Sequence, residues 1–162
     1  MGVLTPVEHS NWATPIVPVL KPDNTVRICG DFRVTLNPVL QGIQHPLPKI
    51  DHLFAKHCNS VYFSKIDLKD AYAQLCLSEE SQKLVVINTH MGLFAYTRLP
   101  YGINCAASTF QRVLEQTIGD MEGVTIFQND ISISGKTRTE HNKKLESVLS
   151  KLLDAGLKVK IE

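Results

Sequence analysis

Two aspartates stand at positions where a folded chain could hold a metal ion. Asp67 ends an apolar, β-rich run (61–68), and Asp130 lies in the polar turn of a tight hairpin. Carboxylates at a strand end and a neighbouring hairpin turn can converge on Mg²⁺, which prefers hard oxygen ligands and is completed by water and substrate phosphates. Two such ions about 4 Å apart can activate an attacking hydroxyl and stabilise a leaving group in line. Spacing alone leaves a second interpretation open, because most strand-end aspartates are turn or cap residues.

Other kinds of reactive site have little support. The four cysteines form no C-x-x-C pair, which argues against a zinc or redox motif, so we expect reduced and mostly buried thiols. The six histidines are equally scattered. Neither G-x-x-x-x-G-K-[ST] nor G-x-G-x-x-G occurs, so the usual loops that cradle phosphate are missing.

The elements that would position the aspartates follow from local patterns. Alternating or β-rich runs between turn residues predict strands over 16–20, 26–29, 61–68, 84–88, 93–99, 124–127 and 131–134. Pro48 predicts a short helix from 50 onward, apolar spacing predicts a helix that stops at Gly119, and a capping box at Thr137–Glu140 predicts one that stops at Gly156. We expect the last two helices to cover one face of an antiparallel sheet, in an α+β fold.

Length and composition exclude several classes of protein. A chain of 162 residues with 43% hydrophobic and 20% charged residues is globular, neither disordered nor collagen-like, and of single-domain size. Because no signal peptide or apolar run of about 20 residues is present, we expect an intracellular protein, cytoplasmic or nuclear, with no membrane partner. Its net charge of +1 means that any nucleic-acid binding would use a local basic stripe.

Longer strings of residues surround the two aspartates. Through these strings the chain resembles, over essentially its whole length, the reverse transcriptase (RNA-directed DNA polymerase) of long-terminal-repeat retroelements, especially the Ty3/gypsy group. The strings that carry the resemblance are 11–17 and 26–33 (fingers), 46–50 (link to the palm), 63–72 (the palm strand with the first catalytic carboxylate), and 98–102 with 110–112 (the next block).

The resemblance implies a fold and a set of partners. We expect one reverse transcriptase domain fragment, α+β, in which 1–45 and about 73–105 are fingers-like and 46–72 and 106–162 are mainly palm, with an antiparallel palm sheet backed by helices and no thumb. The implied partners are an RNA or DNA template with its primer, deoxynucleotide triphosphates, and a longer pol polypeptide that supplies the thumb and RNase H.

The resemblance also implies metal ligands and phosphate contacts. Asp67 and Asp130 would be catalytic carboxylates that bind two Mg²⁺ (or Mn²⁺) ions. Lys21 and Arg27 would neutralise the incoming triphosphate, a role that suits the planar fork of arginine. A solvated surface charge is the alternative interpretation for Lys21.

Three further residues are implied to contact substrate. Tyr72 would lie beneath the sugar of the incoming nucleotide and exclude a 2′-hydroxyl by its bulk. Tyr101 would shape the nucleotide and template pocket, and Gln111 is expected to be substrate-binding. For both tyrosines, a role as core aromatic residues is the alternative.

One departure bears directly on catalysis. The family signature at the hairpin turn is Tyr-x-Asp-Asp, whereas this chain has Phe127-Gln128-Asn129-Asp130, so Asn129 is a degenerate third catalytic position. An amide offers one neutral oxygen and also carries a donor. A pair of unit charges 4 Å apart is worth about 4 kcal/mol at an effective dielectric near 20, and losing half of that would lower metal occupancy or rate more than tenfold. We therefore expect a weak or inactive polymerase.

Two hypotheses about function follow. The first is an enzyme, an RNA-directed DNA polymerase fragment that is impaired by Asn129 and by the missing thumb and RNase H. The second is a catalytically inactive retroelement remnant that acts as a binding module or has no selected role. Magnesium-dependent primer extension, compared with an Asn129→Asp variant, distinguishes them.

Overall fold

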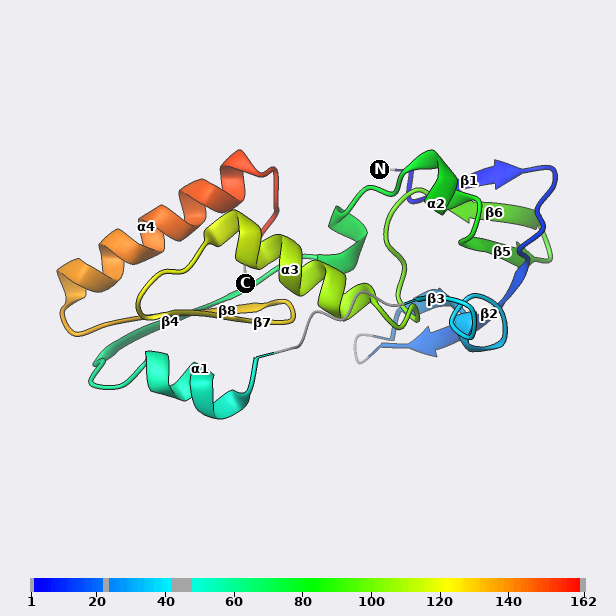
Figure 1. Ribbon diagram of the computed structural model, residues 1–162. Coiled ribbons are helices and arrows are strands. Elements are labelled where there is room, and N and C mark those ends of the chain that lie inside the picture. Colours follow the sequence, from blue (N-terminus) through cyan, green and yellow to red (C-terminus); the bar gives the residue numbers. More distant parts are fainter. Residues whose placement is uncertain (1, 22–23, 42–47, 161–162) are drawn as a thin grey trace. The chain divides into compact units, whose positions relative to one another are not determined.

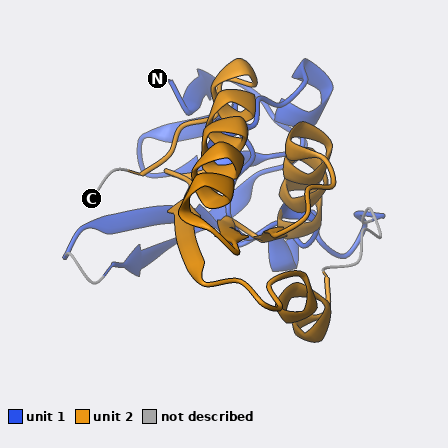
Figure 2. Ribbon diagram, turned by 90° about the vertical axis from the view of Figure 1, so that its left-hand side faces the viewer, with its two compact units in different colours: residues 1–43, 72–106 blue, residues 44–71, 107–162 orange. Residues whose placement is uncertain are grey.

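The chain folds into two compact units, each with its own sheet (Figures 1 and 2). The computed structural model describes residues 2–21, 24–41 and 48–160. Unit 1 consists of residues 1–43 and 72–106, and unit 2 of residues 44–71 and 107–162. The strands form two sheets in which every pair except β2–β5 is antiparallel, and helices accompany them, so the expected α+β class is confirmed.

Unit 1 contains a five-stranded sheet whose strand order is β1-β6-β5-β2-β3. The strands are β1 (Leu4–Val7), β2 (Thr14–Leu20), β3 (Val26–Gly30), β5 (Val86–Thr89) and β6 (Gly92–Tyr96). The expected hairpins β2–β3 and β5–β6 are confirmed as antiparallel pairs, with ends shifted by up to three residues. One pair in this sheet is parallel: β2 pairs with β5, with Thr14 opposite Ile87 and Pro15 opposite Asn88.

Several elements of unit 1 were not predicted from the sequence. Strand β1 contains Pro6, which fits an edge strand because proline cannot donate to the hydrogen-bond ladder. The short helices η1 (Phe32–Val34) and α2 (Glu79–Gln82) are single turns, and η2 (Ala71–Gln74) follows the segment that leaves unit 2. The core of unit 1 is formed by Phe32, Leu36, Val85, Ile87, Tyr96, Leu99, Ile103 and Ala106.

Unit 2 contains a three-stranded antiparallel sheet in the order β4-β8-β7, backed by helices. The strands are β4 (Tyr62–Asp67), β7 (Val124–Phe127) and β8 (Asp130–Gly135). The helices α3 (Ala106–Ile118) and α4 (Arg138–Asp154) cover one face, as expected, and α1 (Ile50–Lys56) lies on the other (Figure 1). The side chains buried beneath α3 and α4 include Ile66, Phe110, Leu114, Ile118, Ile126, Ile131, Ile133, Val148 and Leu152.

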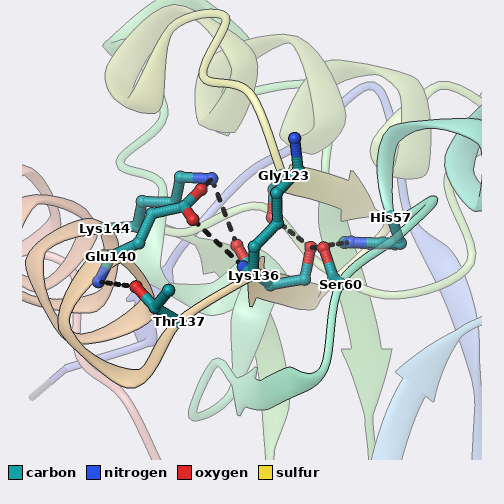
Figure 3. Close-up of polar contacts among 8 residues, drawn as sticks. His57, Ser60, Gly123, Lys136, Thr137, Glu140 and Lys144 are labelled. Atoms are coloured by element: carbon teal, nitrogen blue, oxygen red, sulfur yellow. Dashed lines mark hydrogen bonds and ion pairs between the residues drawn. The ribbon is translucent and has the colours of Figure 1, made fainter.

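The predicted helix ends of unit 2 are confirmed. Gly119 (φ 75°) and Gly156 (φ 70°) follow α3 and α4 in the left-handed conformation that ends a helix. At the start of α4, the Thr137 hydroxyl accepts a hydrogen bond from Glu140 N (3.2 Å). The Glu140 carboxylate closes the cap one residue earlier than a standard capping box, because it accepts from Lys136 N at 3.0 Å (Figure 3).

A polar cluster attaches the end of α1 to the sheet of unit 2 (Figure 3). The His57 ring, at the C-cap of α1, lies 2.7 Å from Ser134 Oγ through Nδ1 and 2.8 Å from Thr125 Oγ1 through Nε2. Ser60 donates to the same Ser134 hydroxyl at 3.0 Å. Burial, and then the charge of Lys144, lower the pKa of His57, so the neutral ring is favoured in the folded state.

The four cysteines differ in exposure from what the sequence predicts. The expectation of mostly buried thiols is wrong: Cys58 and Cys76 are exposed, and Cys29 and Cys105 are half-buried. These cysteines lie at element ends and on the edge hairpin, where neither sheet nor helix covers them fully.

Within the described ranges, no helix has the length and apolar character needed to span a bilayer.

Candidate active site

The pairing of β4 with β8 brings the two predicted aspartates together. Asp67, the last residue of β4, lies directly opposite Asp130, the first residue of β8. Directly opposed residues of an antiparallel pair project from the same face, so both carboxylates lie at one end of one face of the sheet. The sequence placed Asp130 in the turn, and this is corrected: the turn consists of Gln128 and Asn129 alone.

The turn itself brings Asn129 to Asp67. Of its two residues only Gln128 has a positive φ (56°), as in a type II′ turn, although glycine is the residue usually found there. The Asn129 side chain donates from Nδ2 to Asp67 Oδ1 at 3.1 Å. The Asn129 carbonyl also accepts from Leu68 N (3.3 Å), which fixes the turn against the end of β4.

Asp130 has a cationic neighbour that the sequence did not predict. Lys65 lies on β4 two residues before Asp67 and so projects from the same face. Its ammonium lies 2.9 Å from Asp130 Oδ2. Register alone creates this diagonal pair, so only a correct prediction of the β4–β8 alignment would have revealed it.

Gln111 supports the turn from behind. Its side chain is fully buried in α3, where Nε2 donates to the Ile126 carbonyl (2.9 Å) and Oε1 accepts from Gln128 N (2.8 Å). A second donation reaches Glu115 Oε1 at 2.7 Å. The expected direct contact of Gln111 with substrate is not compatible with this burial, since every polar atom of the amide is occupied by the protein itself. Gln111 instead stabilises the β7–β8 turn through these hydrogen bonds.

The donor set can be compared with what a divalent ion requires. Two carboxylates on one face, with solvent at the half-buried Asp130, provide the hard oxygen ligands that suit one Mg²⁺ with bound water. Asn129 directs an N–H toward Asp67, which does not favour a second ion. Among the described residues, no three His, Cys, Asp or Glu side chains gather closely enough to hold a metal. The residues present therefore fit one ion better than two.

Unit 1 brings three of the predicted substrate residues into one stack. The Arg27 guanidinium lies 4.3 Å from the centre of the Tyr101 ring, within the range of a cation–π contact. The Tyr101 ring in turn lies 5.0 Å from that of Tyr72, at 47°. All three side chains are half-buried, and burial raises the pKa of Tyr72. The tyrosines are thus neither isolated surface groups nor fully buried core residues.

Lys21 lies in the same β2–β3 hairpin as Arg27. It directly follows β2, and its backbone N–H donates to the Thr25 carbonyl at 2.9 Å. Since Val19 is opposite Arg27 in the β2–β3 register, Lys21 continues the face that carries Arg27. Residues 22 and 23 of the predicted turn lie outside the described residues.

The loop that carries Tyr101 is fixed by a residue that the sequence did not single out. Asn37 donates from Nδ2 to the Gly102 carbonyl (2.8 Å), and its Oδ1 accepts from Asn104 N (3.0 Å). Gly102 has a φ of 97°, and a Cβ at this position would lie 2.9 Å from the Gly30 carbonyl oxygen. Only glycine fits both conditions.

Comparison with known families and structures gives consistent matches. The family model described as reverse transcriptase (RNA-dependent DNA polymerase) matches residues 19–162. An uncharacterised protein of Caenorhabditis elegans is 41% identical over the whole chain, and the transposon Tf2-3 polyprotein of Schizosaccharomyces pombe is 33% identical over 90% of it. The chain spans only 13% and 11% of these two relatives.

Solved structures match the whole fold. A foamy viral protease–reverse transcriptase in complex with double-stranded DNA is 29% identical, with a TM-score of 0.89 over 98% of this chain and 28% of the other. The same viral protein in complex with an RNA/DNA hybrid gives a TM-score of 0.87 at 29% identity, over 98% of this chain and 21% of that one.

Proposed function

The chain belongs to the reverse transcriptase (RNA-dependent DNA polymerase) family, and we propose that it is the fingers and palm of a retroelement polymerase in which Asn129 impairs nucleotidyl transfer. In this proposal unit 1 is the fingers-like part and unit 2 the palm. The substrates are a primer with its RNA or DNA template, and deoxynucleotide triphosphates.

One observation carries the proposed impairment. The amide of Asn129 donates to Asp67 Oδ1, so a ligand position that is a carboxylate in the family signature here supplies a hydrogen-bond donor. A bound divalent ion would neutralise charge on the transferring phosphates. Asp67 and Asp130 would hold that ion from the end of β4 and the start of β8, with one negative charge fewer than the family signature provides.

The substrate side of the proposal rests on unit 1. Arg27 presents a planar guanidinium that suits phosphate oxygens, and Tyr101 supports it through its ring. Lys21, on the same face of the hairpin, would add a second positive charge for the triphosphate. Tyr72 packs against Tyr101 and would limit the space at the sugar.

Metal binding tests the proposal without requiring turnover. In calorimetric titrations with MgCl₂ and MnCl₂, we expect Asn129→Asp to bind at least tenfold more tightly than the parent chain, because it adds a full charge at ligand distance. Asn142→Asp is the matched control, since it adds the same charge to unit 2 on the exposed face of α4. Equal affinities for parent and Asn129→Asp would contradict the proposed impairment.

Primer extension supplies the catalytic readout. With an RNA template and labelled DNA primer, Asn129→Asp should extend the primer more than tenfold faster than the parent chain. If both chains extend the primer, and the parent does so as fast as this variant, the impairment is overturned and the parent is a fully active polymerase. A chain that binds the hybrid in a fluorescence anisotropy assay, and extends it in neither form, would support the alternative of a binding module.

A further inference from the structure

The ion pair between β4 and β8 gives the metal end of the sheet a cation of its own. Lys65 Nζ lies 2.9 Å from Asp130 Oδ2, and the side chains of Lys65 and Asp130 are 67% and 41% exposed. Lys65 is held on this face by the register, which places it opposite Ser132 and one diagonal step from Asp130. The contact is therefore set by the sheet and not by a flexible loop.

From this geometry we propose that Lys65 is an internal counter-cation that competes with the divalent ion for Asp130 and sets the metal affinity of this site. The inference rests on the proposed function only in taking Asp67 and Asp130 as the metal ligands. An ammonium placed on a carboxylate oxygen occupies a direction from which a metal would bind. It also adds a positive charge within a few ångströms of any ion at that carboxylate.

The asparagine at position 129 makes the Lys65–Asp130 ion pair more important for the charge of the site. With Asn129 in the turn, two carboxylates remain, and Lys65 offsets one of them. The site then holds about half the negative charge that attracts a divalent ion. Because an exposed ion pair is weak, a divalent ion can displace Lys65 from Asp130. The ammonium stays nearby, however, and its repulsion lowers the affinity of the site for the ion.

Removing the ammonium should therefore tighten metal binding. In titrations with Mn²⁺ alone, followed by electron paramagnetic resonance of the free ion, we expect Lys65→Met to bind more than tenfold more tightly than the parent chain. A unit charge about 6 Å from a divalent ion accounts for about tenfold even in bulk dielectric, and the release of Asp130 from its ion pair adds to this. Lys65→Arg keeps the charge and should bind as the parent does. Circular dichroism and thermal unfolding check that each variant is folded.

Two comparisons make the test specific. Lys56→Met removes another exposed ion pair of unit 2, Lys56 Nζ to Asp120 Oδ1 at 2.6 Å, and should leave Mn²⁺ affinity unchanged. In an Asp130→Asn background, Lys65→Met should have a smaller effect than in the parent, because only its general charge then acts on the ion and the release of Asp130 no longer contributes.

The outcomes separate this inference from the proposed function. If Lys65→Met matches the parent while Asn129→Asp binds more tightly, the counter-cation role is wrong and the proposed metal site stands. If neither variant changes affinity, both are wrong. If the effect of Lys65→Met persists undiminished in Asp130→Asn, Lys65 acts on the ion by general charge alone, and competition for Asp130 is overturned.

Discussion

Single side chains decide the shape of the β7–β8 turn. Gln128 takes a positive φ that glycine would adopt more readily, and Asn129 projects toward Asp67 only while that turn holds. The amide of Gln111 bonds the backbone on both sides of Phe127, at the Ile126 carbonyl and at Gln128 N. A buried amide with all its partners in place thus keeps a strained turn in one conformation.

Replacing Gln111 should destabilise unit 2 measurably. Gln111→Leu leaves the Ile126 carbonyl and Gln128 N without their partners, so we expect the free energy of unfolding to fall by about 2–4 kcal/mol. Gln116→Leu, an exposed position on the same helix, should change it by less than about 0.5 kcal/mol. Urea denaturation measures both, and similar values for the two variants would argue against the turn-holding role.

Two arginines in unit 1 differ in what they can offer an anion. Arg33 is 80% exposed, but its guanidinium forms a bidentate pair with Asp31 (2.8 and 3.0 Å), which lowers the pKa of that carboxyl. Arg27 instead rests on the ring of Tyr101. The aromatic ring orients the guanidinium and leaves its N–H groups for another acceptor.

Arg27 should therefore dominate nucleotide binding. In equilibrium dialysis with labelled dATP, Arg27→Gln should weaken binding about tenfold, the loss expected for a charge-assisted hydrogen bond. Arg33→Gln should change it less than twofold. If both variants lose the same affinity for dATP, nucleotide binding depends only on the overall charge of the protein.

At the scale of elements, local signals were predictable and long-range ones were not. The capping box, the glycines after α3 and α4, and both unit 1 hairpins depend on neighbouring residues, so the sequence indicated them correctly. The β1–β6 pairing and the parallel contact between β2 and β5 join residues far apart, for which no local pattern exists.

The same distinction applies to the site. Asp67 and Asp130 were found because flanking strings match a family, and their opposition across β4 and β8 fits that expectation. Lys65 carries no such signal, since its contact follows from register and not from residue type. Gln111 was assigned to substrate because a sequence motif does not say which side of a helix faces the interior.

The attachment of α1 through His57 should depend on pH. Burial and the charge of Lys144 lower the pKa of His57 below its ordinary value of 6.5 in the folded state. The unfolded chain therefore binds a proton near pH 6.5 that the folded chain does not, and the free energy of unfolding should decrease as the pH falls from 6.5 to the folded pKa. Below the folded pKa, His57 is protonated in both states. Its contribution to the free energy of unfolding is then fully lost and no longer changes with pH.

Urea unfolding between pH 7.5 and 5 measures this effect. His57→Gln should lack the decrease over the window just below pH 6.5, whereas His90→Gln, at an exposed position in the β5–β6 turn, should retain it. A parent chain and His57→Gln with the same pH profile would show that the ring does not titrate differently on folding.

At the scale of the whole molecule, both units are discontinuous in sequence. The chain builds part of unit 1, then part of unit 2, and returns to complete each in turn. The net charge of +1 gives no overall attraction to nucleic acid, so binding should depend on local groups such as Lys21 and Arg27.

Thiol reactivity reports on the folded molecule as a whole. With a chromogenic disulfide reagent, Cys58 and Cys76 should react fast, while the half-buried Cys29 and Cys105 react at least several-fold more slowly. In denaturant all four should react at one fast rate. Cys58→Ser combined with Cys76→Ser should remove the fast phase, and a fast phase that survives would contradict the exposure seen in the folded chain.

The interleaved order of the strands has a consequence for synthesis on the ribosome. Asp67 of β4 pairs with Asp130 of β8, so about 60 residues must be translated before β4 meets its partner, which takes roughly 3–12 s at ordinary elongation rates. Throughout that interval the nascent chain carries an unpaired apolar strand outside the exit tunnel. We therefore expect co-translational chaperones to bind β4 during this interval, until β8 is translated.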